Sequence, residues 1–542
     1  MAHSDSSGKH IFSTIHDPDL PPYRSSLIKQ DDSIPGIRTL RLQSVIVLFL
    51  SRMVGSGIFA TPGGILADCQ GSVLLFMVTW VIGGVIALSG TCVYLELGSY
   101  LPVNGATKIF LEFMYPYPLY YTSFIFGAFT ILFNFSSTNA LVFAEYIRYA
   151  LGYSYQESAI KYLAITAITA VVCAHGYSRN VGLAVQNFIG LIKIIQISML
   201  FLTCIYVFLF PESLTGIENH LHLKDFTSLP STFSSVSYAT ATLKAIHSFG
   251  GWTSAFAVQN EIKKPIQTLR LAAMISLVSI IALYITMNLA YLKVVPHKDI
   301  QFGGQLVGAL FFTKLFGPYY GHVLFSLFIA LASLGNLLVV VFVDSRLVVE
   351  VAREGLVPFS SILRSNRPFH TPLAALITHG ILSSLVIIIP RNRVYSYIIS
   401  LQFYPNQVFH AIVCLGLLFR IRRKFPNVIA PTRAPTFVVF ICLLGSLSVV
   451  LSPFISSSKN SFKDASFAFI GVGALLLLSF CWFILYYWWP LRGNFSVERE
   501  WKEDSFDGMT YYECYKSLRN DELDDYGSIN IENRRSLGGA NY

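Results

Sequence analysis

Long apolar runs constrain the fold of this chain more than any other feature of its sequence. Twelve runs follow one another, each roughly 18 to 31 residues long. About 20 apolar residues allow a helix to cross the hydrocarbon core of a bilayer, and a helix satisfies its backbone hydrogen bonds internally. The runs therefore predict an all-α integral membrane protein with twelve transmembrane helices, at roughly residues 42–66, 73–98, 119–149, 160–177, 183–210, 236–258, 271–295, 319–349, 371–390, 395–419, 436–456 and 466–489.

Composition indicates the same environment. Of the 542 residues, 54% are hydrophobic and 13% are charged, whereas a soluble domain carries about 25% charged residues. The net charge of +9 is spread over short loops, which argues against a nucleic-acid partner. The eight cysteines lie mostly within the apolar runs and form no C-x-x-C pair, so we expect neither disulfides nor a metal site. No cofactor is expected.

Two of the runs contain glycines at mid-depth, where an opened helix would be costly in lipid. The first run contains "MVGSGIF" at 53–59, and the sixth contains "HSFGGWTSAF" at 247–256. Glycine is a poor helix former, and a lone GSG more often serves close helix packing. A matching break in the second half of a ten-run core instead favours a five-plus-five inverted repeat with discontinuous helices 1 and 6. Open backbone is tolerated there because it lines a cavity.

The chemistry of such breaks predicts a ligand class. The N-termini of half-helices attract a carboxylate, and unwound carbonyls accept hydrogen bonds from an ammonium. A zwitterionic amino acid supplies both groups. The two breaks are therefore predicted to form an amino acid site near the middle of the membrane.

Basic residues set the expected orientation and divide the chain. They gather after runs six, eight and ten, on the side of both tails, which the positive-inside rule makes cytoplasmic. The mixed charge of the last segment predicts little ordered structure there. The predicted segments are a cytoplasmic N-terminal tail (1–41), a ten-helix inverted-repeat transport core (42–419), a basic cytoplasmic loop with helices 11 and 12 (420–489), and a cytoplasmic C-terminal tail (490–542).

Several motifs resemble those of one transporter family. The segments "GSGIFATP" at 55–62, "YLELGSYLPVNGATKIFLE" at 94–112 and "SFGGW" at 248–252 are similar to the amino acid–polyamine–organocation superfamily. "SRLVVEVAREGLVPFSSIL" at 345–363 resembles its L-type amino acid transporter branch, and "REGLVPFSSILRSNRPFHTP" at 353–372 resembles the fungal methionine permeases within that branch. The resemblance covers nearly all of the chain between the tails.

This resemblance implies roles for individual residues. Backbone N–H groups of the first break would bind the substrate carboxylate, and carbonyls of both breaks would bind the ammonium. The second break and run ten would supply the opposing wall. The implied substrate-binding residues are Met53, Val54, Gly55, Ser56, Gly57, Ser248, Phe249, Gly250, Gly251, Trp252, Thr253 and Asn406.

Two further residues receive predicted roles. His247 stands where relatives place a gating phenylalanine, so it is a candidate gate; most histidines in helices are merely packed or hydrogen-bonded. Lys193 matches a lysine that, in sodium-independent relatives, occupies the volume of a coupling sodium ion. It lies too deep in its run to reach the membrane surface easily, so we expect it to act in coupling.

The function implied is secondary-active import of methionine or related neutral apolar amino acids by alternating access, coupled to protons and independent of sodium, at a fungal plasma membrane. An amino-acid-sensing receptor with little transport, or a broader neutral amino acid exchanger, would keep the same pocket. An enzyme is not expected, because no catalytic triad is identifiable. The loop at 150–159 lacks the cysteine through which mammalian relatives bind a glycoprotein, so no disulfide-linked heavy chain is expected. The tails are expected to recruit ubiquitin-ligase adaptors.

Overall fold

The structure is a computed structural model. It describes residues 40–518 apart from 102–105, 211, 213–215, 228–233, 258, 260–261, 368, 370, 390–393, 425–429, 456–464, 494 and 504–509. The predictions made for the N-terminal tail and for the end of the C-terminal tail therefore fall outside the described residues.

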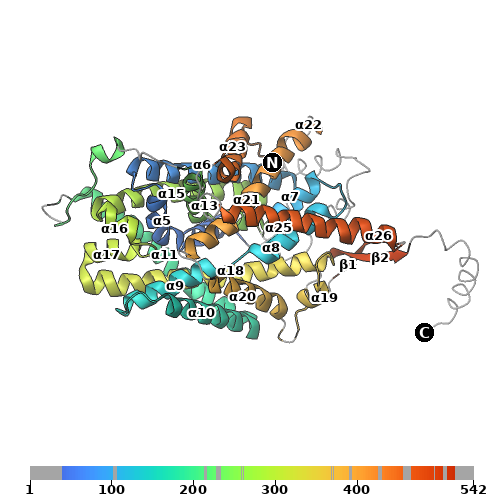
Figure 1. The fold of residues 1–542 in the computed structure, drawn as a ribbon, viewed down its shortest axis with the longest axis horizontal. Helices are drawn as coiled ribbons and strands as arrows, with labels where there is room; N and C mark the ends of the chain where they lie inside the picture. The colour runs from blue at the N-terminus through green and yellow to red at the C-terminus, as the bar shows by residue number, and fades with distance from the viewer. Residues whose placement is uncertain are drawn as a thin grey trace, which may run out of the picture.

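The first half of the chain is helical from the first predicted run onwards (Figure 1). Its helices are α3 (Leu42–Met53), α4 (Gly57–Ala60), α5 (Pro62–Asp68), α6 (Val73–Tyr100), α7 (Thr107–Met114), α8 (Tyr121–Phe133), α9 (Ser137–Ala150), α10 (Glu157–Tyr177) and α11 (Arg179–Leu209), followed by the short 3-10 helix η1 (Leu223–Thr227).

The second half continues in the same way. Its helices are α13 (Ser235–Ser248), α14 (Ser254–Ala257), α15 (Pro265–Val294), α16 (His297–Phe302), α17 (Val307–Gly317), α18 (Phe325–Arg353), α19 (Ser360–Leu363), α20 (Leu373–Ile388), α21 (Val394–Leu415), α22 (Arg422–Lys424), α23 (Thr436–Ile455), α25 (Ser466–Phe483) and α26 (Trp489–Arg492). Three π-helical segments join some of them: η3 (Pro318–Leu324), η4 (Gly416–Ile421) and η5 (Ile484–Trp488).

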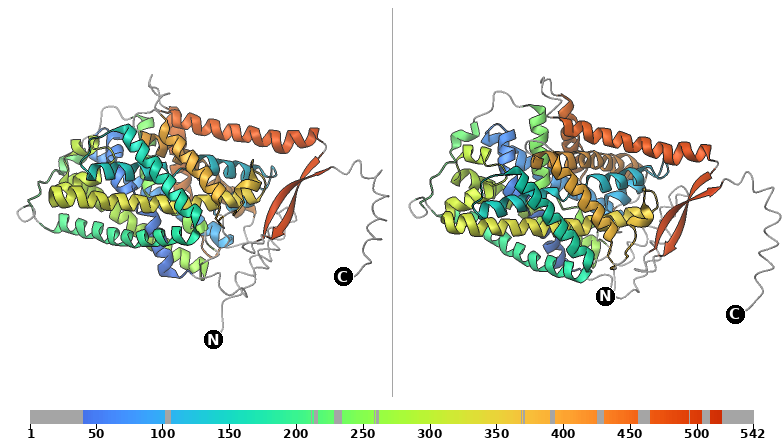
Figure 2. Two further views of the ribbon diagram at one scale, coloured as in Figure 1. Left: turned by 90° about the horizontal axis from the view of Figure 1, so that it is seen from below. Right: turned by 60° about the horizontal axis from the view of Figure 1, so that its bottom comes forward.

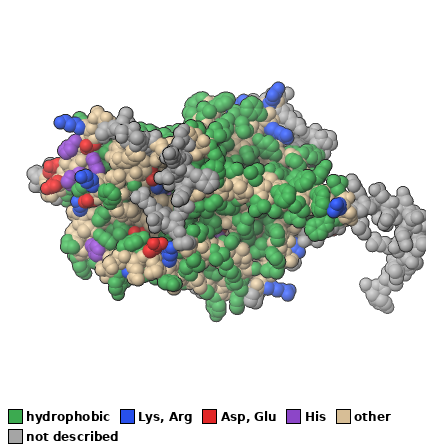
Figure 3. Space-filling view, viewed as in Figure 1, with side chains coloured by type: hydrophobic (Ala, Val, Ile, Leu, Met, Phe, Trp, Pro, Cys, Tyr) green, Lys and Arg blue, Asp and Glu red, His purple; other side chains and the backbone are tan. Residues whose placement is uncertain are grey.

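Ten helical stretches of the described chain are long and apolar enough to cross a membrane. They confirm the predicted all-α membrane architecture but not the predicted count of twelve. The two remaining predicted runs correspond to α13 with α14, which the second break interrupts, and to α20, which has 16 residues. Hydrophobic side chains cover most of the face seen in Figure 3, and charged side chains lie mainly toward its ends.

The C-terminal segment contains structure that the sequence analysis did not expect. Strands β1 (Phe495–Glu503) and β2 (Thr510–Leu518) form an antiparallel hairpin at one end of the helical bundle (Figure 2). The prediction of little order after residue 490 is therefore wrong for these strands. It relied on charge, whereas the tyrosines of "TYYECYKSL" favour a strand.

Aromatic packing holds the second break in place. The Phe249 ring lies 5.9 Å from that of Trp80 on α6 and 5.1 Å from that of Tyr284 on α15, measured between centroids. Trp80 and Tyr284 contact each other edge to face at 5.9 Å. Such pairs stabilise packing beyond the area they bury. The cluster fixes the end of α13 against two continuous helices.

Two ties join the two broken helices outside the breaks. Near the surface, Leu40 pairs with Ile262 as an isolated parallel bridge, and the amide of Lys263 donates to the Leu40 carbonyl at 2.9 Å. Near the breaks, Arg52 Nε donates to Ser254 Oγ at 3.1 Å. α3 is therefore bonded at both of its ends to the chain that follows the second break.

Candidate functional site

The first break releases backbone carbonyls at the end of α3. The helix ends at Met53 and the next one begins at Gly57, so the last carbonyls of α3 have no helical donor. Side chains from other helices bond two of them. Lys193 Nζ donates to the Ser51 carbonyl at 2.9 Å, and the Tyr284 hydroxyl donates to the Met53 carbonyl at 3.0 Å. A carbonyl has a second lone pair, so Met53 can still accept from a ligand.

Backbone amides are released at both breaks. The second break lies between Ser248 and Ser254, and Gly251 adopts a φ of +103°, which strongly favours glycine. Unpaired amides beside a cavity are suited to an anionic group. Among the described residues, the amides without an acceptor at the breaks include those of Gly55, Ser56 and Gly57 and those of Gly251, Trp252 and Thr253.

The two breaks face each other closely. A Cβ at Gly57 would lie 2.7 Å from Ser248 Cα, and a Cβ at Gly251 would lie 2.7 Å from Arg52 Cγ. Thr61 Oγ1 and Ser248 Oγ are 2.8 Å apart. Glycine is therefore required at both positions for the two chains to approach, and a hydroxyl pair joins them.

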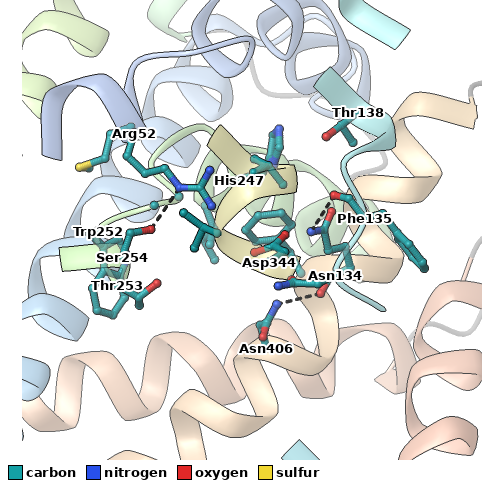
Figure 4. A pocket seen from close by; sticks show the side chains of 18 of the residues that line it. Arg52, Asn134, Phe135, Thr138, His247, Trp252, Thr253, Ser254, Asp344 and Asn406 are labelled. Atoms are coloured by element: carbon teal, nitrogen blue, oxygen red, sulfur yellow. Dashed lines mark hydrogen bonds between the residues drawn. The ribbon is translucent and has the colours of Figure 1, made fainter. Parts of the chain in front are cut away.

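A cavity of about 270 Å³ lies where the two breaks meet (Figure 4). Helices α8, α9, α18 and α21, with the start of α7, complete its walls. The structure therefore brings together most of the residues predicted from the sequence. Those that line the cavity are Met53, Gly55, Ser56, Gly57, His247, Ser248, Gly250, Gly251, Trp252, Thr253 and Asn406.

Three predicted residues do not line this cavity. Val54 is buried beside it, and the ring of Phe249 packs in the aromatic cluster described above. The resemblance implied that carbonyls of the breaks bind the ammonium, so a role for the Phe249 carbonyl stays a prediction. Lys193 lies behind the first break.

Lys193 connects three helices. Its side chain is 1% exposed, and besides the Ser51 carbonyl its ammonium bonds Oδ1 of Asn336 on α18. Asn336 in turn lies against Gly55, where a Cβ would meet its Nδ2 at 1.5 Å. The lysine thus holds a carbonyl freed by the first break and reaches the cavity wall through one amide side chain.

His247 faces the cavity at the end of α13. Its ring meets the Phe403 ring edge to face, with centroids 4.9 Å apart. Its Nδ1 has no hydrogen-bond partner among the described residues. The side chain therefore packs as an aromatic ring at the cavity wall. This is the position expected of a gate, and the gating role stays a prediction.

Much of the cavity wall was not predicted from the sequence. Between α8 and α9 a third interruption, at "NFS" (134–136), turns polar groups inward, and Ser56 Oγ donates to Asn139 Oδ1 at 2.8 Å. The polar segment "NFSST" within the third apolar run was the available signal. The missed lining residues include the aromatic Phe126, Phe129, Phe135, Phe403 and Phe409 and the polar Asn134, Thr138, Asn139, Gln402, Gln407 and His410.

Comparison with known proteins identifies the family. The profile of the family described as "Amino acid permease" matches residues 40–480. The chain is 34% identical over 458 residues to the low-affinity methionine permease of Saccharomyces cerevisiae, covering 83% of this chain and 82% of that one. It is 28% identical over 429 residues to the high-affinity methionine permease of the same yeast, covering 78% and 74%. It is 27% identical over 431 residues to the b(0,+)-type amino acid transporter 1 of Mus musculus, covering 77% and 82%.

These matches confirm the resemblance drawn from the motifs, and they extend across all of the described transmembrane helices up to α25. The relatives are permeases and transporters, so the chain is not an enzyme. It is an integral membrane protein of the amino acid permease family.

Proposed function

We propose that this protein is a secondary-active permease that imports methionine or related neutral apolar amino acids by alternating access. The observation that carries the proposal is the small cavity at two facing backbone breaks, with free amides and an aromatic wall. The amides suit a carboxylate, and the phenylalanines suit an apolar side chain. The two yeast relatives are named as methionine permeases, which supports methionine as the substrate.

The proposed roles within the site follow the free backbone groups. The amides of Ser56 and Gly57 bind the substrate carboxylate. The carbonyls of Met53 and Ser248, with those of Val54 and Phe249 at the margin, take the ammonium. Gly250, Gly251, Trp252, Thr253 and Asn406 shape the wall around the side chain, and His247 with Phe403 gates the site.

Lys193 is the proposed coupling residue. Its ammonium holds the Ser51 carbonyl, which a sodium ion could otherwise coordinate, and a second cation in that volume would be repelled. Import would therefore be independent of sodium. A buried lysine that releases and recovers a proton during the cycle provides a route for proton coupling.

Uptake of labelled methionine into cells that lack their own methionine permeases tests the proposal. Accumulation above the external concentration, reduced by other unlabelled apolar amino acids, is expected. Signalling without accumulation would instead indicate a sensor. Uptake that depends on preloaded internal amino acid would indicate an exchanger.

We place the protein in the plasma membrane with both termini in the cytoplasm. Two features support this orientation: the Lys and Arg residues after runs six, eight and ten, and the Lys and Arg side chains at the hairpin end of the face in Figure 3. We expect no disulfide-linked heavy chain, because the loop at 150–159 has no cysteine. Recruitment of ubiquitin-ligase adaptors is proposed for the tails.

A further inference from the structure

An unpartnered carboxylate lies on the wall of the cavity. Asp344 of α18 is 5% exposed, lines the cavity and points into it (Figure 4). Among the described residues it has no hydrogen-bond or ion-pair partner. A buried carboxylate without a hydrogen-bond partner is costly, so Asp344 can accept a cationic group that enters the cavity.

An opposite charge faces the same space. Arg52, in the last turn of α3, also lines the cavity, and Asp344 is the acidic side chain whose charge acts on it. The two groups form no ion pair with each other among the described contacts. Arg52 Nε donates to Ser254, so the two terminal nitrogens of the guanidinium remain as donors toward the cavity. One wall therefore offers an anion and another offers a cation.

Other acidic groups do not compete for these positions. Glu96 is bound by Arg422, whose Nε donates to it at 3.0 Å, and by the amide of Ala434 at 2.8 Å. Glu145 is buried on α9 but does not line the cavity. Within the described part of the chain, no group of three or more metal-binding side chains is present. The cavity charges are therefore free for a ligand that carries both signs.

Arg52 lies beside the breaks, and Asp344 lies on α18 between the breaks and one end of the molecule. Asp344 follows Asn336 by eight residues, about 12 Å along a helix. α18 ends at Arg353, and the next residue, Glu354, pairs with Lys108 of α7. The cavity reaches Ala106 and Thr107 at the start of α7. This end is the one predicted to face the cytoplasm.

We propose that Arg52 and Asp344 form a release subsite for the transported amino acid on the path from the breaks to the α7 end. The substrate carboxylate moves from the free amides to the Arg52 guanidinium, and its ammonium moves from the backbone carbonyls to Asp344. Each half of the zwitterion keeps a partner as it leaves, so departure avoids exposing both charges to the apolar wall at once. This inference rests on the proposed function, because it assumes that an α-amino acid crosses the cavity.

The test compares KM with the maximal rate of methionine uptake in Asp344→Asn, Asp344→Glu and Arg52→Gln, at matched amounts of protein in the membrane. Loss of one charge-assisted contact should lower the maximal rate by about tenfold. KM should change by less than about threefold, because the backbone groups of the breaks, which bind the substrate first, remain intact. Asp344→Glu keeps the charge and should retain most of the rate.

Glu145→Gln is the matched control, since it neutralises a buried carboxylate that does not line the cavity; its rate should match that of the native protein. An unchanged rate in Asp344→Asn would overturn the subsite. A faster rate would overturn it as well, because the carboxylate would then restrain opening. A rise in KM alone would place Asp344 in the initial binding site at the breaks and would also contradict the proposal. If the native protein took up no amino acid at all, the proposed function itself would fail, and that result is distinct from these.

Discussion

The hydroxyl of Thr61 lies 2.8 Å from the hydroxyl of Ser248, and this contact joins the two broken helices directly. Thr61 Oγ1 also bonds the Gly57 carbonyl at 2.8 Å, and Ser248 Oγ bonds the Lys244 carbonyl at 2.9 Å. Each hydroxyl has a single hydrogen, so at any moment one of them donates across the pair while the other donates to its own backbone carbonyl. The relative position of the breaks is set by the fold before any ligand arrives, which lowers the cost of binding.

The close approach of the breaks makes Gly57 sensitive to any side chain. Gly57→Val would place a branched Cβ 2.7 Å from Ser248 Cα, in contact with backbone that cannot easily move. Methionine uptake should fall by about tenfold or more while the protein still reaches the membrane. Gly473→Val is the control, because nothing lies within 4 Å of a Cβ there, and it should transport normally. Normal uptake by Gly57→Val would remove the first break from the site.

His247 should be replaceable by another ring. His247→Phe keeps the edge-to-face contact with Phe403 and adds no unpaired polar atom, so it should retain most of the uptake. His247→Ala removes the contact and should transport more slowly, by a few fold, if the ring closes the cavity. Equal transport by the two variants would show that the ring has no gating role. Both are measured as initial rates of methionine uptake.

The position of Lys193 leads to a prediction about ions. Uptake by the native protein should be equal in sodium and choline media. Lys193→Met keeps most of the side-chain length but leaves the Ser51 carbonyl and Asn336 without a donor, so it should abolish accumulation or its dependence on pH. Lys161→Met is the control, since that lysine lies in a partly exposed pair with Glu157. Strong dependence of native uptake on sodium would refute the coupling assignment.

Arg422 should matter for stability rather than for binding. It neutralises Glu96, whose side chain is 0% exposed, so Arg422→Ala leaves a buried charge without its partner. Removing one partner of a buried pair costs roughly 3–5 kcal/mol. Thermal unfolding in detergent should show a large fall in the midpoint. Glu157→Gln, at an exposed pair, should cost less than about 1 kcal/mol. Equal midpoints for the two variants would contradict a structural role for the Glu96 pair.

His297 on α16, outside the membrane-spanning stretches, gives a pH dependence with a defined sign. Burial lowers its pKa from the ordinary 6.5, and nearby Asp225 opposes this shift. The unfolded chain therefore binds the proton more readily, and stability is lost as pH falls from above 6.5 toward the lower folded value. The unfolding midpoint should drop between about pH 7.5 and 5.5, and His297→Gln should show a smaller drop. An identical drop in that variant would assign the effect to other groups.

The sequence allowed prediction of the membrane architecture and of both breaks, because apolar length and paired glycines are local signals. "MVGSGIF" and "SFGGW" led directly to residues that line the cavity. The charges on the opposite walls were harder to assign. Arg52 could have paired with Glu96, Glu145 or Asp344 on sequence alone, and only the fold shows that Glu96 is taken by Arg422.

The aromatic wall could not be predicted for a related reason. Phe126, Phe129 and Phe409 resemble any other apolar residue of a membrane helix, and their orientation depends on how α8 and α21 pack. The hairpin β1–β2 was not predicted, because the mixed charge of the tail indicates little ordered structure. Pairing of two segments is a property that charge content does not reveal.

The two ties between α3 and the chain after the second break have a mechanical consequence. The two half-helices are bonded into one unit at both ends. Arg52 bonds Ser254 at one end, and Leu40 pairs with Ile262 and Lys263 at the other. In the alternating access proposed above, this unit would turn at the glycines of the breaks, where no helical hydrogen bond holds the backbone. Such a movement would keep the bonds within the unit, so opening would change only the contacts between the unit and the rest of the protein.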